Sequence, residues 1–103
     1  MWNKIKLIDF FQKNYKKKIA IEKSDRSLII QGNIIKIEEL DLCSHSLFEV
    51  QIIQKPSHND VYITLHDDFL GINIKLLTKK FNNEKNNTLD QILYENLIIS
   101  GKI

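Results

Sequence analysis

Residues 19–40 read IAIEKSDRSLIIQGNIIKIEEL, a run in which apolar residues alternate with polar ones around two short polar breaks. Such alternation predicts β-strands with one apolar face, and Ser, Asp, Gly and Asn are typical of the turns between strands. We therefore expect three antiparallel strands, joined by two-residue loops at Asp25-Arg26 and Gly32-Asn33.

The two loops predict one register for this meander. The first loop sets Ile21 opposite Ile30, and the second sets Ile30 opposite Ile35. Because side chains alternate between the two faces of a strand, a slip of one residue in either hairpin would break the agreement. The face expected to be buried consists of Ile19, Ile21, Leu28, Ile30, Ile35 and Ile37.

A second hairpin is expected between residues 47–54 and 60–66, around a loop at residues 55–59 that contains Pro56. Both segments alternate, and one register places apolar side chains opposite one another on the inner face. That register pairs Ile52 with Val61 and Val50 with Ile63.

Residues 67–81 permit two interpretations. Residues 72–76 alternate as in a strand, and Gly71 weakens a helix. A helical stripe is the alternative, and it would consist of Leu70, Ile74, Leu77 and Phe81. We favour the strand.

Both ends of the chain have helical spacing. Residues 2–17 carry apolar side chains every three or four residues and end in a lysine run that suits a helix C-terminus. Thr88 and Gln91 form a capping-box pattern, which predicts a helix to about Ile99 that Gly101 ends. The predicted fold class is α+β: an antiparallel meander sheet of five to six strands, with the N-terminal and C-terminal helices packed on one face.

Composition bounds the class of protein. A chain of 103 residues, 43% hydrophobic and 27% charged, predicts a single domain over residues 1–103. No apolar run approaches the ~18 residues of a membrane span, and the N-terminus lacks a signal-peptide cleavage site. The single Cys43 excludes an intramolecular disulfide and fits a reducing compartment. We expect a cytoplasmic protein.

No stretch carries a catalytic or ligand-binding signature. Residues 43–45 (Cys-Ser-His) place a thiol near an imidazole, but nothing nearby predicts an oxyanion site. His66, Asp67 and Asp68 form the best polar cluster, yet a cation site needs more oxygen ligands than these residues supply. We expect no enzyme activity, no cofactor and no metal.

The outer face of the predicted sheet is the candidate site. An aromatic side chain among aliphatic ones, rimmed by carboxylates, is typical of a protein-contact surface. The alternative is that these side chains are covered or scattered. The expected partner-binding residues are Glu49, Gln51, Tyr62, Thr64, His66, Asp67 and Asp68.

The expected function is that of a small protein inhibitor, a bacterial immunity protein or antitoxin whose partner is its cognate toxin. Its acidic residues would occupy the phosphate-binding groove of a nuclease toxin. The alternative is a phage- or plasmid-type nucleic-acid-binding regulator, although Arg26 is the only arginine. We expect a monomer or a weak homodimer formed through an edge strand. The nucleic-acid-binding alternative would use the lysines Lys4, Lys6, Lys13, Lys16, Lys17 and Lys18.

Overall fold

The structure is a computed structural model, and it describes the chain except for residues 28, 43–44, 55–59, 68, 81–82 and 103. The elements in chain order are α1 (Lys4–Lys13), β1 (Lys18–Lys23), β2 (Ile29–Leu42), β3 (His45–Gln54), β4 (Asp60–His66), β5 (Gly71–Lys80), β6 (Asn83–Leu93), the 3₁₀ helix η1 (Tyr94–Asn96) and β7 (Leu97–Lys102).

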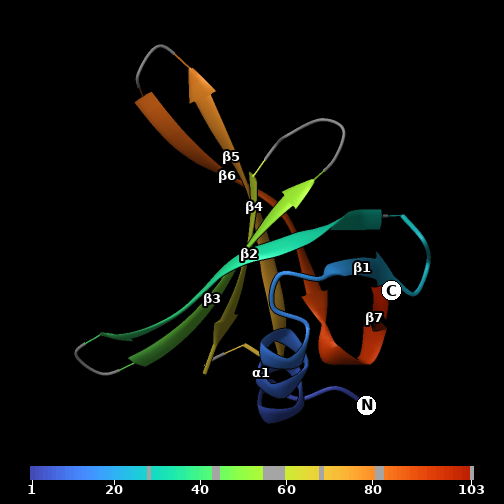
Figure 1. Cartoon of the computed structure of the whole chain (residues 1–103). Helices are drawn as coiled ribbons and strands as arrows, with labels where there is room; N and C mark the ends of the chain where they lie inside the picture. The colour runs from blue at the N-terminus through green and yellow to red at the C-terminus, as the bar shows by residue number, and fades with distance from the viewer. Residues whose placement is uncertain (28, 43–44, 55–59, 68, 81–82, 103) are drawn as a thin grey trace.

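The strands form one seven-stranded sheet in the order β6-β5-β4-β3-β2-β1-β7 (Figure 1). Strands β1 to β6 form a meander in chain order, and β7 returns to pair antiparallel with β1. The two edges of the sheet are therefore β6 and β7, which η1 joins directly.

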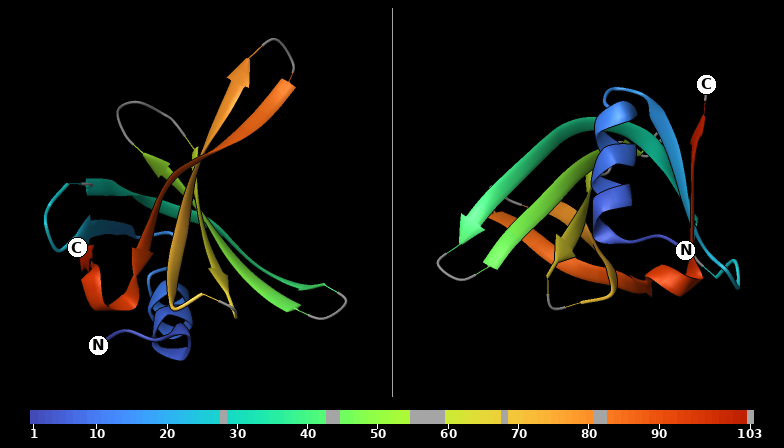
Figure 2. Two further views of the ribbon diagram at one scale, coloured as in Figure 1. Left: turned by 180° about the vertical axis from the view of Figure 1, so that it is seen from behind. Right: turned by 90° about the horizontal axis from the view of Figure 1, so that it is seen from below.

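This connection requires the sheet to curl. Neighbouring strands lie about 4.8 Å apart, so a flat sheet of this size would separate its edges by about 29 Å. The four residue steps from Leu93 to Leu97 span at most about 14 Å. A salt bridge of 3.2 Å between Lys23 of β1 and Asp90 of β6 also joins the two sides. The sheet is accordingly a half-barrel, with α1 on its concave side (Figure 2).

Helix α1 begins at Asn3, whose side chain accepts a hydrogen bond of 2.9 Å from the backbone N–H of Lys6. Leu7 and Phe11 on its inner side are fully buried, and Phe11 stacks on Phe48 of β3. The rest of the core comes from the inward residues of the strands. These include Ile19, Ile21, Ile30, Val50, Ile52, Val61, Ile63, Leu65, Ile72, Ile74 and Ile92.

The predicted C-terminal helix is wrong, and so is the arrangement of two helices packed on one face; the sheet has seven strands rather than the five to six expected. Residues 88–99 lie in β6, η1 and β7 instead. Tyr94, Leu97 and Ile99 are buried, whereas Leu89 and Leu93 of the expected helical stripe are about half exposed. This segment forms strands because β6 pairs with β5 and β7 pairs with β1. The pairing satisfies the backbone hydrogen-bonding groups along one edge of β5 and one edge of β1.

The predicted loop at Gly32-Asn33 is also wrong, because β2 continues through it as one strand of 14 residues. Gly32 pairs with Ile19 of β1 and with Gln54 of β3, and it has no positive φ. Its role is close approach: a Cβ at this position would overlap the carbonyl oxygen of Ile53. Ile35, expected inside, is exposed as a result.

The other expected hairpins are confirmed. Ile21 pairs with Ile30 across the turn at Asp25-Arg26, where Arg26 has φ 61° and the Asp25 carboxylate accepts from Ser27 N–H. Strands β3 and β4 pair in the predicted register, including Ile52 with Val61 and Val50 with Ile63. Residues 71–80 form a strand, as favoured. The loop predicted at residues 55–59 and Leu28 lie outside the described residues.

Candidate functional site

The outer face of the half-barrel points away from α1 and presents two rows of mostly polar side chains. Each row runs across the strands from β2 to β6, with one residue opposite the next. The first row is Glu38, Glu49, Thr64, Asn73 and Gln91; the second is Lys36, Gln51, Tyr62, Lys75 and Thr88.

Two carboxylates lie directly opposite each other in the first row. Glu38 forms a salt bridge of 3.4 Å with Lys36, but Glu49 forms none with any described residue. Partial burial, followed by repulsion from Glu38, raises the pKa of Glu49 above its usual value of 4.5. Lys75 and Lys36 of the second row act in the opposite direction, but neither forms a salt bridge with Glu49, and like charges opposite one another destabilise a sheet.

The neighbouring positions in this row also lack partners. Thr64 is only 2% exposed, and its Oγ1 has no hydrogen-bond partner among the described residues. The same holds for Oδ1 of Asn73, which pairs with Thr64 across β4 and β5. Buried polar atoms are nearly always hydrogen-bonded in folded proteins, so two exceptions side by side mark this part of the sheet.

The second row is better satisfied. The Gln51 amide donates a hydrogen bond of 3.0 Å to the carboxylate of Asp60 on β4. Tyr62 lies opposite both Gln51 and Lys75 and is partly buried. The outer face is thus an ordered surface on the central strands, and the two buried polar atoms without a partner among the described residues both lie in the first row.

A separate polar cluster joins three elements at one end of the sheet. Asp67, just after β4, pairs with Lys4 of α1 and accepts hydrogen bonds from the backbone and the hydroxyl of Ser46 on β3. Lys4 also donates to the Ser46 hydroxyl at 3.1 Å. The hydrogen bond from Lys4, with those from Ser46, lowers the pKa of Asp67 below its usual 3.8.

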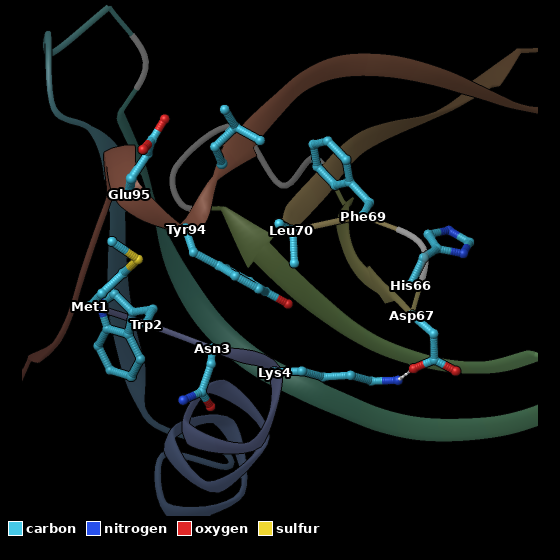
Figure 3. A pocket seen from close by; sticks show the side chains of 11 residues that line it. Met1, Trp2, Asn3, Lys4, His66, Asp67, Phe69, Leu70, Tyr94 and Glu95 are labelled. Atoms are coloured by element: carbon cyan, nitrogen blue, oxygen red, sulfur yellow. Dashed lines mark hydrogen bonds and ion pairs between the residues drawn. The ribbon is translucent and has the colours of Figure 1, made fainter.

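Beside this cluster lies a pocket of about 470 Å³ (Figure 3). Its walls come from the N-terminal segment, from the connection between β4 and β5, and from the turn between β6 and η1. The lining residues are Met1, Trp2, Asn3, Lys4, His66, Asp67, Phe69, Leu70, Leu93, Tyr94 and Glu95.

The structure divides the predicted partner-binding residues between these two places. Glu49, Gln51, Tyr62 and Thr64 lie together on the outer face, although Thr64 is buried rather than exposed. His66 and Asp67 line the pocket instead. Asp68, like Cys43, lies outside the described residues.

The pocket was not predicted from the sequence. Tyr94 was expected on a helix, and the strand favoured at residues 72–76 left residues 67–71 as the connection before it. Two signals were present: Phe69 and Leu70 are bulky apolar residues in a short connection, and Ile92 and Tyr94 alternate as in a strand. Both point to apolar side chains gathered at the end of the sheet.

Three of the lysines expected to bind nucleic acid in the alternative hypothesis interact with other residues of the chain. Lys4 pairs with Asp67, and Lys13 forms a salt bridge of 2.9 Å with Asp9 one helical turn earlier. Lys16 lies over the ring of Tyr15.

Among the described residues, no three His, Cys, Asp or Glu side chains form a group that could hold a metal ion. No helix in the described part of the chain is long and apolar enough to cross a membrane.

The fold and the site define a small antiparallel half-barrel with one helix on its concave side, a polar outer face and an apolar pocket at one end. Comparison of the chain with family models, with curated proteins and with solved structures found no match.

Proposed function

We propose that this protein is a cytoplasmic, non-enzymatic inhibitor of the immunity-protein or antitoxin class, which binds its cognate toxin through the outer face of β3 and β4. The observation that carries the proposal is the first row of this face. Glu49 there is partly desolvated, lies opposite a second carboxylate and has no salt bridge within the described part of the chain.

An incoming cation would resolve this unfavourable arrangement. A Lys or Arg side chain placed between Glu38 and Glu49 would offset their repulsion and could donate hydrogen bonds to both. The isolated protein would then be destabilised by the repulsion between Glu38 and Glu49, and this destabilisation would disappear in the complex. Partner recognition at the expense of stability is common at functional sites.

The toxin that best complements this row has a basic active-site groove, as nucleases do for their phosphate substrates. Glu49 and Glu38 would occupy the position of the phosphate charge. Gln51 and Tyr62 in the adjacent row supply neutral contacts beside them. Charge complementarity of this type directs specificity and the rate of association.

The test begins with the product of the neighbouring gene. Co-expression with a tag on one chain should give a one-to-one complex, and the inhibitor should suppress the toxin's activity. We expect Glu49→Lys to weaken the complex by at least about tenfold, because like charges juxtaposed at an interface cost several kcal/mol.

Glu39→Lys is the matched control, since Glu39 is exposed on β2 and alternates to the other side of the strand from Glu38. It changes net charge equally but leaves the first row intact. Equal weakening by both variants would show that only overall charge matters. Absence of any complex with the neighbouring product would contradict the proposal, as would tight binding of DNA or RNA at low salt in its place.

A further inference from the structure

The pocket beside α1 gathers apolar surface that the fold leaves uncovered. Leu70 is 75% exposed and Leu93 40% exposed, and Met1 is 87% exposed at the same rim. Single exposed apolar side chains are ordinary, but several around one cavity mark a binding site. Trp2 and Phe69 complete the apolar walls (Figure 3).

The size of the cavity limits its occupant. An apolar cavity of about 150 Å³ holds one benzene molecule, and ligand sites commonly measure about 300–1,000 Å³. At about 470 Å³, this pocket has room for a flat ligand of up to about four fused rings, or an aliphatic molecule of similar bulk. It is larger than one side chain of a partner protein would fill.

Tyr94 supplies one hydrogen-bond donor inside this apolar space. Its side chain is 8% exposed and extends across the pocket toward the Lys4–Asp67 pair (Figure 3). Its hydroxyl makes no hydrogen bond to another residue in the described part of the chain. Burial, helped by the Asp67 carboxylate, raises the pKa of Tyr94, so the phenol stays protonated and can donate at neutral pH.

The charges at the rim favour a neutral ligand. Lys4 and Asp67 neutralise each other, and the remaining carboxylate in the lining belongs to Glu95. The other cationic group of the lining is the α-amino group of Met1, and the Glu95 carboxylate balances its charge, so a carboxylate or phosphate group would lose its hydration with no net positive charge to compensate.

We propose that this pocket binds a small, neutral, largely apolar molecule that carries an oxygen acceptor, such as a carbonyl, for the Tyr94 hydroxyl. The site is independent of the outer face on which the proposed inhibitor function rests. Its ligand is recognised by shape and one hydrogen bond rather than by charge.

Fluorescence titration with two neutral dyes tests the proposal. Nile red is a flat fused-ring dye with a carbonyl oxygen, whereas N-phenyl-1-naphthylamine has no oxygen acceptor. We expect saturable, one-to-one binding of Nile red with blue-shifted emission. Tyr94→Phe should weaken Nile red by about fivefold, the value of one hydrogen bond, and leave the second dye unchanged.

Leu70→Glu should weaken both dyes by at least about tenfold, because it places a charge at an apolar mouth. Leu70 is exposed, so this variant keeps the fold. The matched control is Ile5→Glu, at an apolar position of α1 that is 81% exposed and outside the lining; it should bind as the native protein does. Glu49→Lys should also bind normally, which separates this site from the outer face.

Three results would overturn the proposal. The first is no saturable binding of Nile red by the native protein. The second is equal loss in Leu70→Glu and Ile5→Glu, which would show general surface adsorption. The third is unchanged Nile red affinity in Tyr94→Phe, or equal weakening of both dyes, because either would remove the assigned role of the hydroxyl.

Discussion

Thr64 and Glu49 lie opposite each other on β4 and β3, and neither is fully satisfied by its neighbours. The fold raises the pKa of Glu49, so the folded state favours the protonated carboxyl over the ionised one. The stability that this preference contributes at low pH is lost as pH rises through the folded pKa. At neutral pH the residue therefore works against folding. Such conflicts between local chemistry and the fold are expected at functional sites.

Replacing Thr64 with valine tests this directly. Thr64→Val keeps the side-chain shape and removes a buried hydroxyl that has no described partner, so we expect the free energy of unfolding to rise by about 1 kcal/mol. Urea denaturation at pH 7 measures it.

Thr88→Val serves as the matched control, because Thr88 lies on the same face in β6 but is exposed. Its effect should stay within about 0.5 kcal/mol. If Thr64→Val instead destabilised the protein, the hydroxyl would have a partner in solution and the row would not be unsatisfied.

At the scale of elements, local pattern predicted two of the three expected hairpins correctly and long-range pairing poorly. The turn at Asp25-Arg26 and the register of β3 with β4 follow from side chains close together in sequence. Gly32-Asn33 resembles a turn locally, but β2 is long because it pairs with β1 along one edge and β3 along the other. A turn signal inside a strand is overridden when both neighbours need the backbone.

Gly32→Ala should therefore destabilise the protein although the site is not a turn. Its Cβ would overlap the Ile53 carbonyl and lie 2.7 Å from Cγ2 of Ile52, so β2 and β3 would have to separate. We expect a loss of about 1–3 kcal/mol, measured by urea denaturation.

Gly101→Ala is the control for this variant. At Gly101 in β7 the atoms nearest to an added Cβ belong to the side chain of Asn14, which can move at the cost of its hydrogen bond to the Phe10 carbonyl without separating two strands. A loss at Gly101 equal to that at Gly32 would contradict the explanation by backbone contact.

At the scale of the whole molecule, Asp67 ties α1 to two parts of the sheet. Its carboxylate binds Lys4 and Ser46, so it fixes the helix and one wall of the pocket together. The fold lowers the pKa of Asp67, so this stabilisation is present above the unfolded value of about 3.8 and is lost as pH falls through the folded pKa.

Asp67→Asn should consequently lower the melting temperature at neutral pH. The difference from the native protein should stay constant down to about pH 5 and shrink in more acidic solution, as thermal unfolding followed by circular dichroism would show. Asp9→Asn is the control, since the Asp9–Lys13 pair is exposed within one helix and should have little effect. A pH-independent difference between Asp67→Asn and the native protein would contradict this role of the carboxylate.

The candidate site was predictable to the same extent as its strands. Because β3 and β4 are neighbours in sequence, the alternation alone placed Glu49, Gln51, Tyr62 and Thr64 on one face. The sequence did not reveal that Thr64 is buried, nor that Glu38 lies opposite Glu49, since both depend on the pairing of β2 with β3. The pocket could not be predicted from the sequence, because its walls come from segments about 90 residues apart.

The sequence by itself determined the N-terminal helix, the local hairpins and the inward side of the central strands, because neighbouring residues decide these features. Only the tertiary structure decided that residues 88–102 form strands and a short 3₁₀ helix, because their periodicity also fits an α-helix. The reason is physical: β1 and β5 each needed a partner along one edge, and a curled sheet allowed one short segment to reach both. That same curl created the pocket at its end and left the outer face of β3 and β4 turned away from α1.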